Sequence, residues 1–401
     1  RRIYMLAATI LFYDQTQKVV DLHGDIPWSE AGMIGANGGD YTASLPKYDK
    51  AIDIYTKMLD DLKAFADELN TIVVPSFVVT PFKTQDLINH GNIDLWKRYC
   101  NSLRVRMLTR VSGVASLQGR VNTEIGEIVG SPANYPVVTT NAQNIKLSVF
   151  SPTTDITARG FQSGLEDWNG NIAGKKMIDH MKTNADPRLR AMFEPGGNSG
   201  GVYNGLDPMA NRTDQTALIA GGTMAIYNRS TLSRNQYFPG ILITASEVKF
   251  MLAEYYQKNA NNAAAKTAYQ DGVTQSIEFY YWLRTLSADN TAGPLTPYTG
   301  GEVTTYLATA ANNWDLAADK LALIATQKWI HYSVVQPIES WAEIRRLNAP
   351  TFNFQPDNAN AQTQPPVRWF YATSEPTYNA ENYKEVAADD KLTTKIFWDI
   401  N

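Results

Sequence analysis

The sequence predicts a mostly α fold, in which tetratricopeptide-like helix pairs form a scaffold and a large, irregular, loop-rich part is attached to it. Apolar residues recur at helical spacing near both ends of the chain. A helix-pair repeat occurs after residue 251, and residues 120–240 are punctuated by Pro, Gly, Asn and Thr. We expect a single domain of residues 1–401, with the scaffold at about 1–118 and 244–350.

Composition places the chain among ordinary globular proteins. It has 401 residues, of which 44% are hydrophobic and 19% charged, and its formal net charge is −4. Lys and Arg do not cluster on any segment, which argues against nucleic acid and against an anionic membrane surface as main partners. The single cysteine, Cys100, excludes an internal disulfide and a thiolate metal cluster. No apolar run approaches the ~18 residues that span a bilayer.

Three long helices are expected in the first third of the chain, over residues 1–21, 47–69 and 86–113. Their apolar residues repeat every three or four positions, as on the buried face of a helix. Arg1 opens the first helix without a cap, so we expect that a preceding segment with any targeting signal has been removed.

The connection between the first two helices begins with HGDIPWSE and is longer than the about 2–8 residues that helix–helix connections usually need. We expect Gly24 to end the first helix, Asp25 to bond the turn and Pro27 to fix the direction of exit. The loop then carries two aromatic residues that a turn does not require, and such loops are functional suspects. Trp28 and Tyr41 are therefore candidate ligand-binding residues.

Residues 119–243 and 285–315 are expected to be irregular, with short helices and a small hairpin around apolar runs such as IKLSVF. Helical order returns at Thr244, where TASE is a capping box. The next segment has tetratricopeptide spacing, with small residues that let two helices approach closely: Leu252, Ala253, Tyr256, Ala265, Tyr269 and Gly272. Further helices are expected at KLALIATQKWIHYSVV and IESWAEIRRL, before an irregular segment at 351–401.

The sequence offers no catalytic or metal-binding motif. No nucleophile elbow, phosphate loop or dinucleotide fingerprint is present, and GGNSGG at 196–201 lacks the strand–helix context of a phosphate loop. We therefore expect no cofactor and no metal site, and we expect the helical His331 to be structural. The four histidines are scattered without HxxxH or HExxH spacing: His23, His90, His180 and His331.

Two carboxylate pairs leave a sugar-cleaving enzyme open as an alternative, because a glycoside hydrolase needs only two carboxyl groups. The pairs are Asp25 with Glu30 and Glu166 with Asp167. Adjacent carboxylates in loops are usually solvated, and Asp25 is explained by its turn. An enzyme would need both groups on one cleft, about 5–9.5 Å apart.

Aromatic residues in polar loops are the positive indication of function. Trp168 lies in LEDWNGN beside Asn169 and Asn171, and Tyr203 lies in GVYNG beside Asn204. A sugar ring has an apolar face and a rim of hydroxyls, so it binds a flat aromatic ring that is flanked by amide or carboxylate groups. The alternative is that each ring fills the core from a loop.

Trp168 gives the sharpest test of this interpretation. Its neighbours in sequence offer little apolar company for burial, so we expect an exposed indole that lines a ligand cleft, with Tyr203 or Trp28 nearby. Trp168→Ala should then weaken sugar binding by about 1–3 kcal/mol. The same change should alter the free energy of unfolding by less than about 0.5 kcal/mol.

Seven segments, in order along the chain, resemble the SusD/RagB family and most closely its SusD-like branch. GDIPW at 24–28 is followed by KYDKAIDIYTKMLDDL, NSLRVRMLTR and NADPRLR. ASEVKFMLAEYY, QKWIHY with ESWAEIRRLNAP, and PVRWFYATSEPTYNAENY complete the series. The lipid-bearing cysteine of the family has no counterpart here, since Cys100 lies within a predicted helix.

The resemblance implies a surface lipoprotein of the outer membrane of Bacteroidetes that binds an oligosaccharide or polysaccharide and is not an enzyme. It implies a SusC-like TonB-dependent channel as partner, ligand binding by the irregular part, and membrane contact only through an N-terminal lipid anchor. Some members prefer peptides, so a peptide ligand stays open. A pure scaffold for protein partners also stays open, and it predicts no small-ligand cleft.

Overall fold

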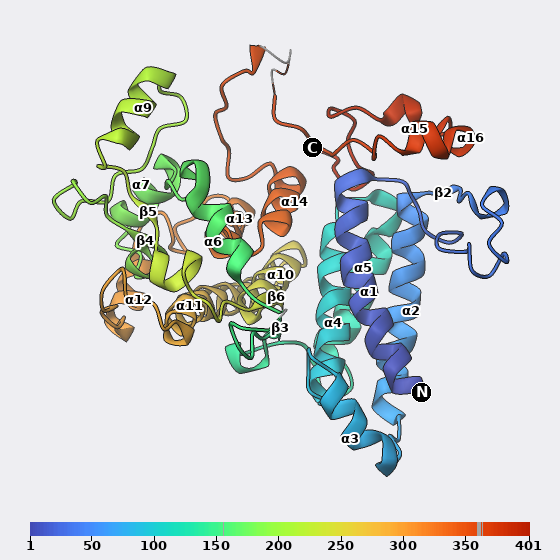
Figure 1. The fold of residues 1–401 in the computed structure, drawn as a ribbon. Coiled ribbons are helices and arrows are strands. Elements are labelled where there is room, and N and C mark those ends of the chain that lie inside the picture. The colour runs from blue at the N-terminus through green and yellow to red at the C-terminus, as the bar shows by residue number, and fades with distance from the viewer. Residues whose placement is uncertain (155, 359–361, 363) are drawn as a thin grey trace.

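The computed structural model describes residues 1–154, 156–358, 362 and 364–401, and it confirms the predicted mostly α fold (Figure 1). The N-terminal helices form an upright block, from which the loop between α1 and α2 projects to one side. The block extends past residue 118, farther than predicted, because α5 packs on α4. Its helices are α1 (Arg2–His23), α2 (Ala51–Thr71), α3 (Ser76–Gln85), α4 (Ile93–Arg110) and α5 (Gln118–Gly130), with η2 (Ala115–Leu117) between the last two.

The third predicted helix, 86–113, is wrong at its start and replaced there by a turn between α3 and α4. The Asp86 carboxylate accepts backbone N–H groups of Ile88, Asn89 and Gly91 at 2.9–3.0 Å, and the Trp96 indole N–H at 2.7 Å. Gly91 has φ +73°, and a Cβ there would lie 2.9 Å from the Lys83 Cα. A buried Asp that bonds the backbone locally therefore outweighs the helical apolar pattern.

The second block is built on two long helices that pack along each other, and these are the predicted repeat. A Cβ added at Gly272 would lie 2.6 Å from the Phe250 ring, so the missing side chain permits the close approach. α13 packs on α10, and α14 packs on α13. The four helices are α10 (Ala245–Lys258), α11 (Asn262–Leu286), α13 (Lys320–Tyr332) and α14 (Pro337–Leu347).

Short elements fill the part that was predicted to be irregular. IKLSVF does form a strand, β3 (Ile145–Leu147), but it pairs antiparallel with β6 (Gly240–Ile243) rather than within a local hairpin. Thr244, directly after β6, forms the predicted capping box with Glu247. The other elements are η3 (Asn141–Gln143), α6 (Arg159–Glu166), η4 (Asp167–Asn169), α7 (Lys175–Thr183), α8 (Leu189–Met192), β4 (Phe193–Glu194), α9 (Arg212–Ala220), β5 (Ile226–Tyr227), the π-helix η5 (Arg229–Ser233) and α12 (Gly300–Ala308).

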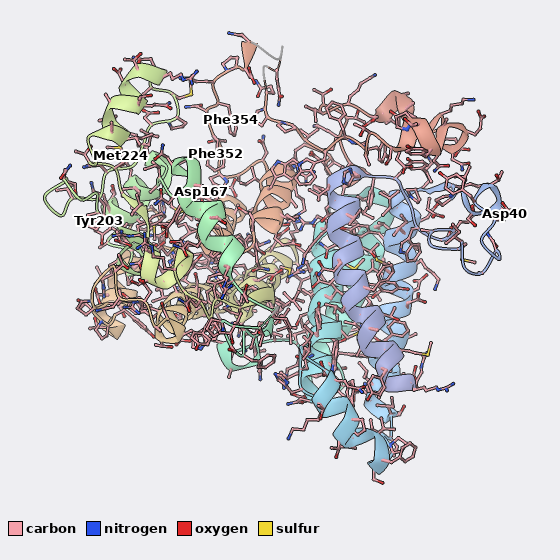
Figure 2. The ribbon with its side chains drawn as sticks, viewed as in Figure 1. Asp40, Asp167, Tyr203, Met224, Phe352 and Phe354 are labelled. Atoms are coloured by element: carbon pink, nitrogen blue, oxygen red, sulfur yellow. The ribbon has the colours of Figure 1, made fainter. Side chains whose placement is uncertain are left out.

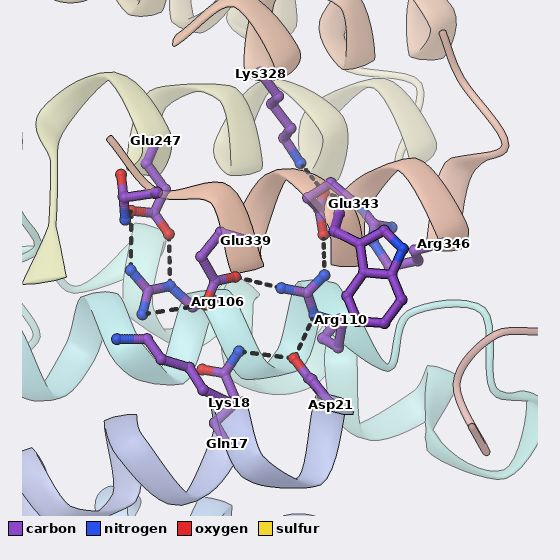
Figure 3. Close-up of polar contacts among 12 residues, drawn as sticks. Gln17, Lys18, Asp21, Arg106, Arg110, Glu247, Lys328, Glu339, Glu343 and Arg346 are labelled. Atoms are coloured by element: carbon purple, nitrogen blue, oxygen red, sulfur yellow. Dashed lines mark hydrogen bonds and ion pairs between the residues drawn. The ribbon is translucent and has the colours of Figure 1, made fainter. Parts of the chain in front are cut away.

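A cluster of buried charges joins the two blocks (Figure 3). Arg106 on α4 donates to Glu247 of α10 at 2.5 Å and to Asp14 of α1 at 2.9 Å. Arg110, one turn later, donates to Glu343 at 2.8 Å and to Glu339, both on α14. We call the set the buried ion cluster: Asp14, Arg106, Arg110, Glu247, Glu254, Lys328, Glu339, Glu343 and Arg346.

Oppositely charged side chains pair at the centre of this cluster, and their pairing offsets the free-energy cost of removing them from water. Lys328 of α13 donates to Glu254 at 3.1 Å and to Glu343 at 2.7 Å, and Arg346 binds the same two carboxylates. Burial alone would raise the pKa of Glu343, but Arg346, Lys328 and Arg110 outweigh it and hold that pKa well below its usual range. Glu343 is therefore ionised in the folded protein.

The C-terminal segment runs back across both blocks. After α14, the Lys176 ammonium on α7 donates to the Thr351 carbonyl, and farther on the Trp369 N–H donates to the Leu22 carbonyl at 2.8 Å. The Trp398 indole then donates to Asp21 at 2.8 Å. The remaining elements belong to this segment or to the α1–α2 loop: α15 (Glu375–Tyr378), α16 (Ala380–Tyr383), η7 (Ala387–Asp389), β1 (Ile26–Pro27), η1 (Thr42–Ser44) and β2 (Tyr48–Asp49).

Candidate functional site

The sequence-predicted site residues lie in two separate regions of the molecule. Figure 2 shows Asp40, in the loop that carries Trp28 and Tyr41, at the opposite end from Tyr203 and Asp167. Each region is therefore a candidate site by itself, and each has to be judged on its own geometry.

The first region begins with the turn after α1. Gly24 ends the helix at φ +80°, as predicted, and its N–H donates to the Val20 carbonyl. Asp25 bonds the start of α2 rather than its own turn, because its carboxylate accepts the Ala51 N–H and the Lys50 ammonium, each at 2.8 Å. The motif is thus a structural clasp between the two helices.

Trp28 follows this clasp and is half-buried. Its ring centroid lies 6.0 Å from that of Tyr13 on α1, and its backbone N–H donates to Asp49 at 3.0 Å. Asp49 also accepts the backbone N–H and the hydroxyl of Ser29, both at 2.7 Å. Trp28 therefore packs against the helical block and offers only part of its ring to a ligand.

Beyond Trp28 the α1–α2 loop is hydrogen-bonded to the C-terminal segment. The Asn379 amide donates to the Pro46 carbonyl at 2.9 Å, and the Tyr48 hydroxyl donates to Glu375 at 2.6 Å. The Tyr41 hydroxyl lies 3.4 Å from the Tyr378 carbonyl. Two segments more than 300 residues apart in sequence thus build one surface.

Four exposed aromatic rings belong to these two segments. Trp369 also contacts the end of α1, with its ring centroid 6.1 Å from that of His23. The same two segments also carry polar side chains, including Asp40, Glu375 and Asn382. We call the rings the loop aromatic surface: Tyr41 (53% exposed), Trp369 (52%), Phe370 (52%) and Tyr378 (66%).

Three of these four rings were not among the sequence-predicted site residues. Trp369, Phe370 and Tyr378 all lie in PVRWFYATSEPTYNAENY, a stretch that is dense in aromatic residues and lacks helical periodicity. The same aromatic density in polar surroundings that pointed to LEDWNGN was a usable signal here. Only the fold, however, brings this segment beside Tyr41.

In the second region, residues 171–174, 204–206 and 225–227 lie side by side. The Tyr227 N–H donates to the Asn171 carbonyl at 2.8 Å, and the Ala225 N–H donates to the Asn204 carbonyl at 2.7 Å. The fold thus brings the two predicted loop motifs together through backbone hydrogen bonds.

The predicted side chains of this region differ in their hydrogen bonding and exposure. The Asn204 amide donates to the Thr223 carbonyl at 3.2 Å, and Asn171 is half-buried. Tyr203 is half-buried against the apolar cluster around Phe193, and burial raises the pKa of its hydroxyl. Asn169 is exposed in the left-handed conformation, at φ +60°.

Trp168, the residue of the sharpest sequence prediction, has a side chain that lies outside the described residues. Its backbone belongs to η4. The predicted exposure of its indole therefore stays a prediction.

Three of the four carboxylates, Asp25, Glu30 and Glu166, lie in local ion pairs, and Asp167 is exposed. Glu166 accepts the Arg234 guanidinium at 2.8 Å and the Ser233 hydroxyl at 2.6 Å, and Arg234 lowers the pKa of Glu166. Glu30 is exposed and lies 3.9 Å from the Lys47 ammonium. A general acid at neutral pH needs a raised pKa, and the shift of Glu166 has the opposite sign.

His331 is structural, as predicted. Its ring nitrogens lie 2.8 Å from the Thr244 hydroxyl and 3.0 Å from the Ser276 hydroxyl. Burial and the nearby Arg188 lower its pKa to about 3, so the ring is neutral in the folded protein.

Across the part of the chain that the structure describes, no group of three or more His, Cys, Asp or Glu side chains is arranged to hold a metal ion. Within the same part, no helix has the length and apolar character needed to cross a bilayer.

Comparison with known proteins gives one family. A family model described as starch-binding and associating with the outer membrane, the SusD-like model, matches residues 3–372. No curated protein matches the chain significantly.

Solved structures share the fold at low sequence identity. A SusD homologue from Bacteroides fragilis superposes with a TM-score of 0.77 at 19% identity, over 98% of this chain and 82% of its own. A SusD homologue from Bacteroides vulgatus has a TM-score of 0.73 at 23% identity, over 99% and 79%. A chitin-binding protein has a TM-score of 0.74 at 22% identity, over 99% and 81%.

Proposed function

The chain belongs to the SusD-like family of outer-membrane starch-binding proteins, and from this premise we propose that it is a non-catalytic, glycan-binding surface lipoprotein. It captures an oligosaccharide or polysaccharide and delivers it to a SusC-like TonB-dependent channel. An N-terminal lipid would hold it on the outer membrane.

The loop aromatic surface is the single observation that supports glycan capture best. Exposed apolar patches that are rimmed by polar groups are typical of binding sites, and the two segments that carry these rings also carry carboxylate and amide groups. That combination suits a pyranose, whose C–H face stacks on a ring while its hydroxyls bond to the polar rim. Tyr41 is both a sequence-predicted site residue and a member of this surface.

The other sequence-predicted residues stay part of the proposal: Trp28 belongs to the first region, and a second contact region consists of Trp168, Asn169, Asn171, Tyr203 and Asn204. A long glycan can touch both regions, and two weak contacts on one chain add to its overall affinity.

A panel of soluble polysaccharides in affinity electrophoresis, followed by calorimetry with the best ligand, tests the proposal. Tyr41→Ala and Trp369→Ala should each weaken binding about tenfold, which corresponds to about 1.4 kcal/mol. Phe77→Ala is the matched control, because Phe77 is 79% exposed on α3, away from both candidate regions. Equal affinity in all four proteins would remove the loop aromatic surface from the proposal.

A peptide ligand is the second candidate, because exposed aromatic rings beside carboxylates also suit a cationic peptide. If the protein binds peptides saturably and binds no glycan, a peptide replaces the sugar as the proposed ligand. The proposed role in uptake would be unchanged. Release of reducing sugar that disappears in Glu166→Gln or Asp25→Asn would establish the glycoside hydrolase instead.

The channel partnership needs its own experiment. Full-length lipidated protein, purified in mild detergent from native outer membranes, should bring a large β-barrel protein with it. Recovery as a free monomer would contradict this part of the proposal.

A further inference from the structure

A pocket of about 660 Å³ lies between α14 and the C-terminal segment that passes over it. This volume is within the range of about 300–1,000 Å³ that is typical of small-molecule sites. Trp341, Ile344 and Arg345 of α14 line one side, and Phe352, Phe354 and the Pro365–Val367 stretch line the other. We call this cavity the α14 pocket; it is separate from the residues of the loop aromatic surface.

Aromatic rings form the wall of the α14 pocket, and one of them is free to stack. Phe352 is fixed by the Trp329 ring, at 5.4 Å between centroids, and by the Lys176 ammonium, 4.9 Å from its centroid. Phe354, whose centroid is 6.1 Å from that of Phe352, is 51% exposed. Figure 2 labels both rings on the segment that leaves α14.

Polar groups converge on the same cavity. The Arg345 guanidinium stacks 3.9 Å from the Trp341 ring centroid and donates to the carbonyls of Val367 and Asp21. Asp399 lines the pocket with only 6% of its surface exposed, and Lys395 lines it as an exposed cation. Amide side chains of Asn348 and Gln364 complete the polar lining.

We propose that the α14 pocket is a second carbohydrate subsite, which takes one sugar unit of the glycan against Phe354. The inference rests on the proposed glycan-binding function and adds a site to it. A purely apolar ligand would take the remaining water away from the Asp399 carboxylate and return no hydrogen bond, which costs free energy. A sugar covers the aromatic wall with its C–H face and gives Asp399 a hydroxyl donor.

Substitutions at the pocket wall test the subsite by calorimetry with the glycan that the wild-type protein binds. Phe354→Ala should weaken binding about tenfold, while Phe354→Trp should retain it, since an indole offers a larger stacking face. Phe77→Ala is the control for loss of an exposed ring. Because Phe354 is half in solvent, thermal unfolding of both Phe354 variants should match that of the wild-type protein.

A thiol block gives a second measurement that does not depend on removing a ring. Cys100 is fully buried, and burial raises the pKa of its thiol to about 12, so it does not react in the folded protein. Lys395→Cys therefore supplies a single reactive thiol at the mouth of the pocket. A bulky maleimide there should abolish the pocket's contribution, and the same reagent on Lys83→Cys, at the exposed end of α3, should change nothing.

The outcomes separate the two proposals. If the wild-type protein binds no glycan, the proposed function fails and this inference fails with it. If glycan binds, and neither Phe354→Ala nor the blocked Lys395→Cys protein loses affinity while Tyr41→Ala does, the α14 pocket is not a subsite and the proposed function stands. Loss of affinity in both pocket variants, with both controls unchanged, supports the subsite.

Discussion

The buried ion cluster and the loop aromatic surface invert the usual placement of side chains. In the cluster, charged groups lie inside the protein, between α4 and the second block, and each is paired with opposite charge. On the surface, large aromatic rings face solvent. Charges that are buried in pairs fix how helices meet, whereas exposed rings contribute little to folding and are available to a ligand. Stability and recognition therefore reside in different segments.

The largest expected effect comes from breaking the cluster. Arg110→Met should destabilise the protein by about 3–5 kcal/mol, because Asp21, Glu339 and Glu343 would be left buried without their shared cation. Urea unfolding measures this change. Lys57→Ala is the matched control, since the Lys57–Asp61 pair is exposed on α2 and should contribute less than about 1 kcal/mol. Similar losses in both variants would contradict the contrast between buried and exposed pairs.

Burial of the His331 ring on α13 makes the free energy of unfolding depend on pH. Its pKa of about 3 in the folded protein is below its ordinary value of 6.5, so the unfolded chain binds more protons between these values. Stability should thus be unaffected by His331 above pH 6.5 and fall as pH decreases, by up to about 1.4 kcal/mol per pH unit.

The His331→Gln variant isolates this contribution. Its free energy of unfolding should change less than that of the wild-type protein between about pH 6.5 and about pH 5, the interval just below the ordinary pKa of histidine. In that interval Glu254 and Glu343, whose pKa values are lowered by the cations of the cluster, remain ionised. Parallel pH profiles for the two proteins would show that the ring is not buried in its neutral form.

A backbone contact in the second candidate region should give an intermediate effect. A Cβ at Gly205 would lie 2.4 Å from the Lys175 Cα, so Gly205→Ala should cost about 1–3 kcal/mol through overpacking. Gly197→Ala, where a Cβ meets nothing within 4 Å, should be close to neutral. Thermal unfolding of the two variants is sufficient to compare them.

The smallest stability effect is expected on the loop aromatic surface. Tyr41→Ala should change the free energy of unfolding by less than about 0.5 kcal/mol, whereas Trp28→Ala should cost about 1–3 kcal/mol because its half-buried ring packs on Tyr13. Denaturant unfolding beside glycan binding measures both properties. A stable Trp28→Ala protein that no longer binds glycan would show that Trp28 contacts the ligand rather than stabilising the fold.

Local patterns in the sequence determined several elements correctly. The Thr244–Glu247 capping box, the end of α1 at Gly24 and the close approach at Gly272 depend on residues near one another in the chain or on a known repeat. The family resemblance was equally readable, because it rests on short motifs in a fixed order. Periodicity failed at Asp86, where a side chain that bonds local backbone amides interrupts the helical pattern.

Only the tertiary structure decided how distant segments meet. It paired β3 with β6, placed Tyr378 near Tyr41, and brought Phe354 and α14 to the lining of one pocket. It also placed the α1–α2 loop, which carries Trp28 and is marked by Asp40 in Figure 2, at the opposite end of the molecule from Tyr203. The physical reason is that a spacing pattern records which face of one element is buried, but a binding surface needs side chains whose proximity is set by long-range contacts. In this protein those contacts are the buried ion cluster and the C-terminal segment that crosses both blocks.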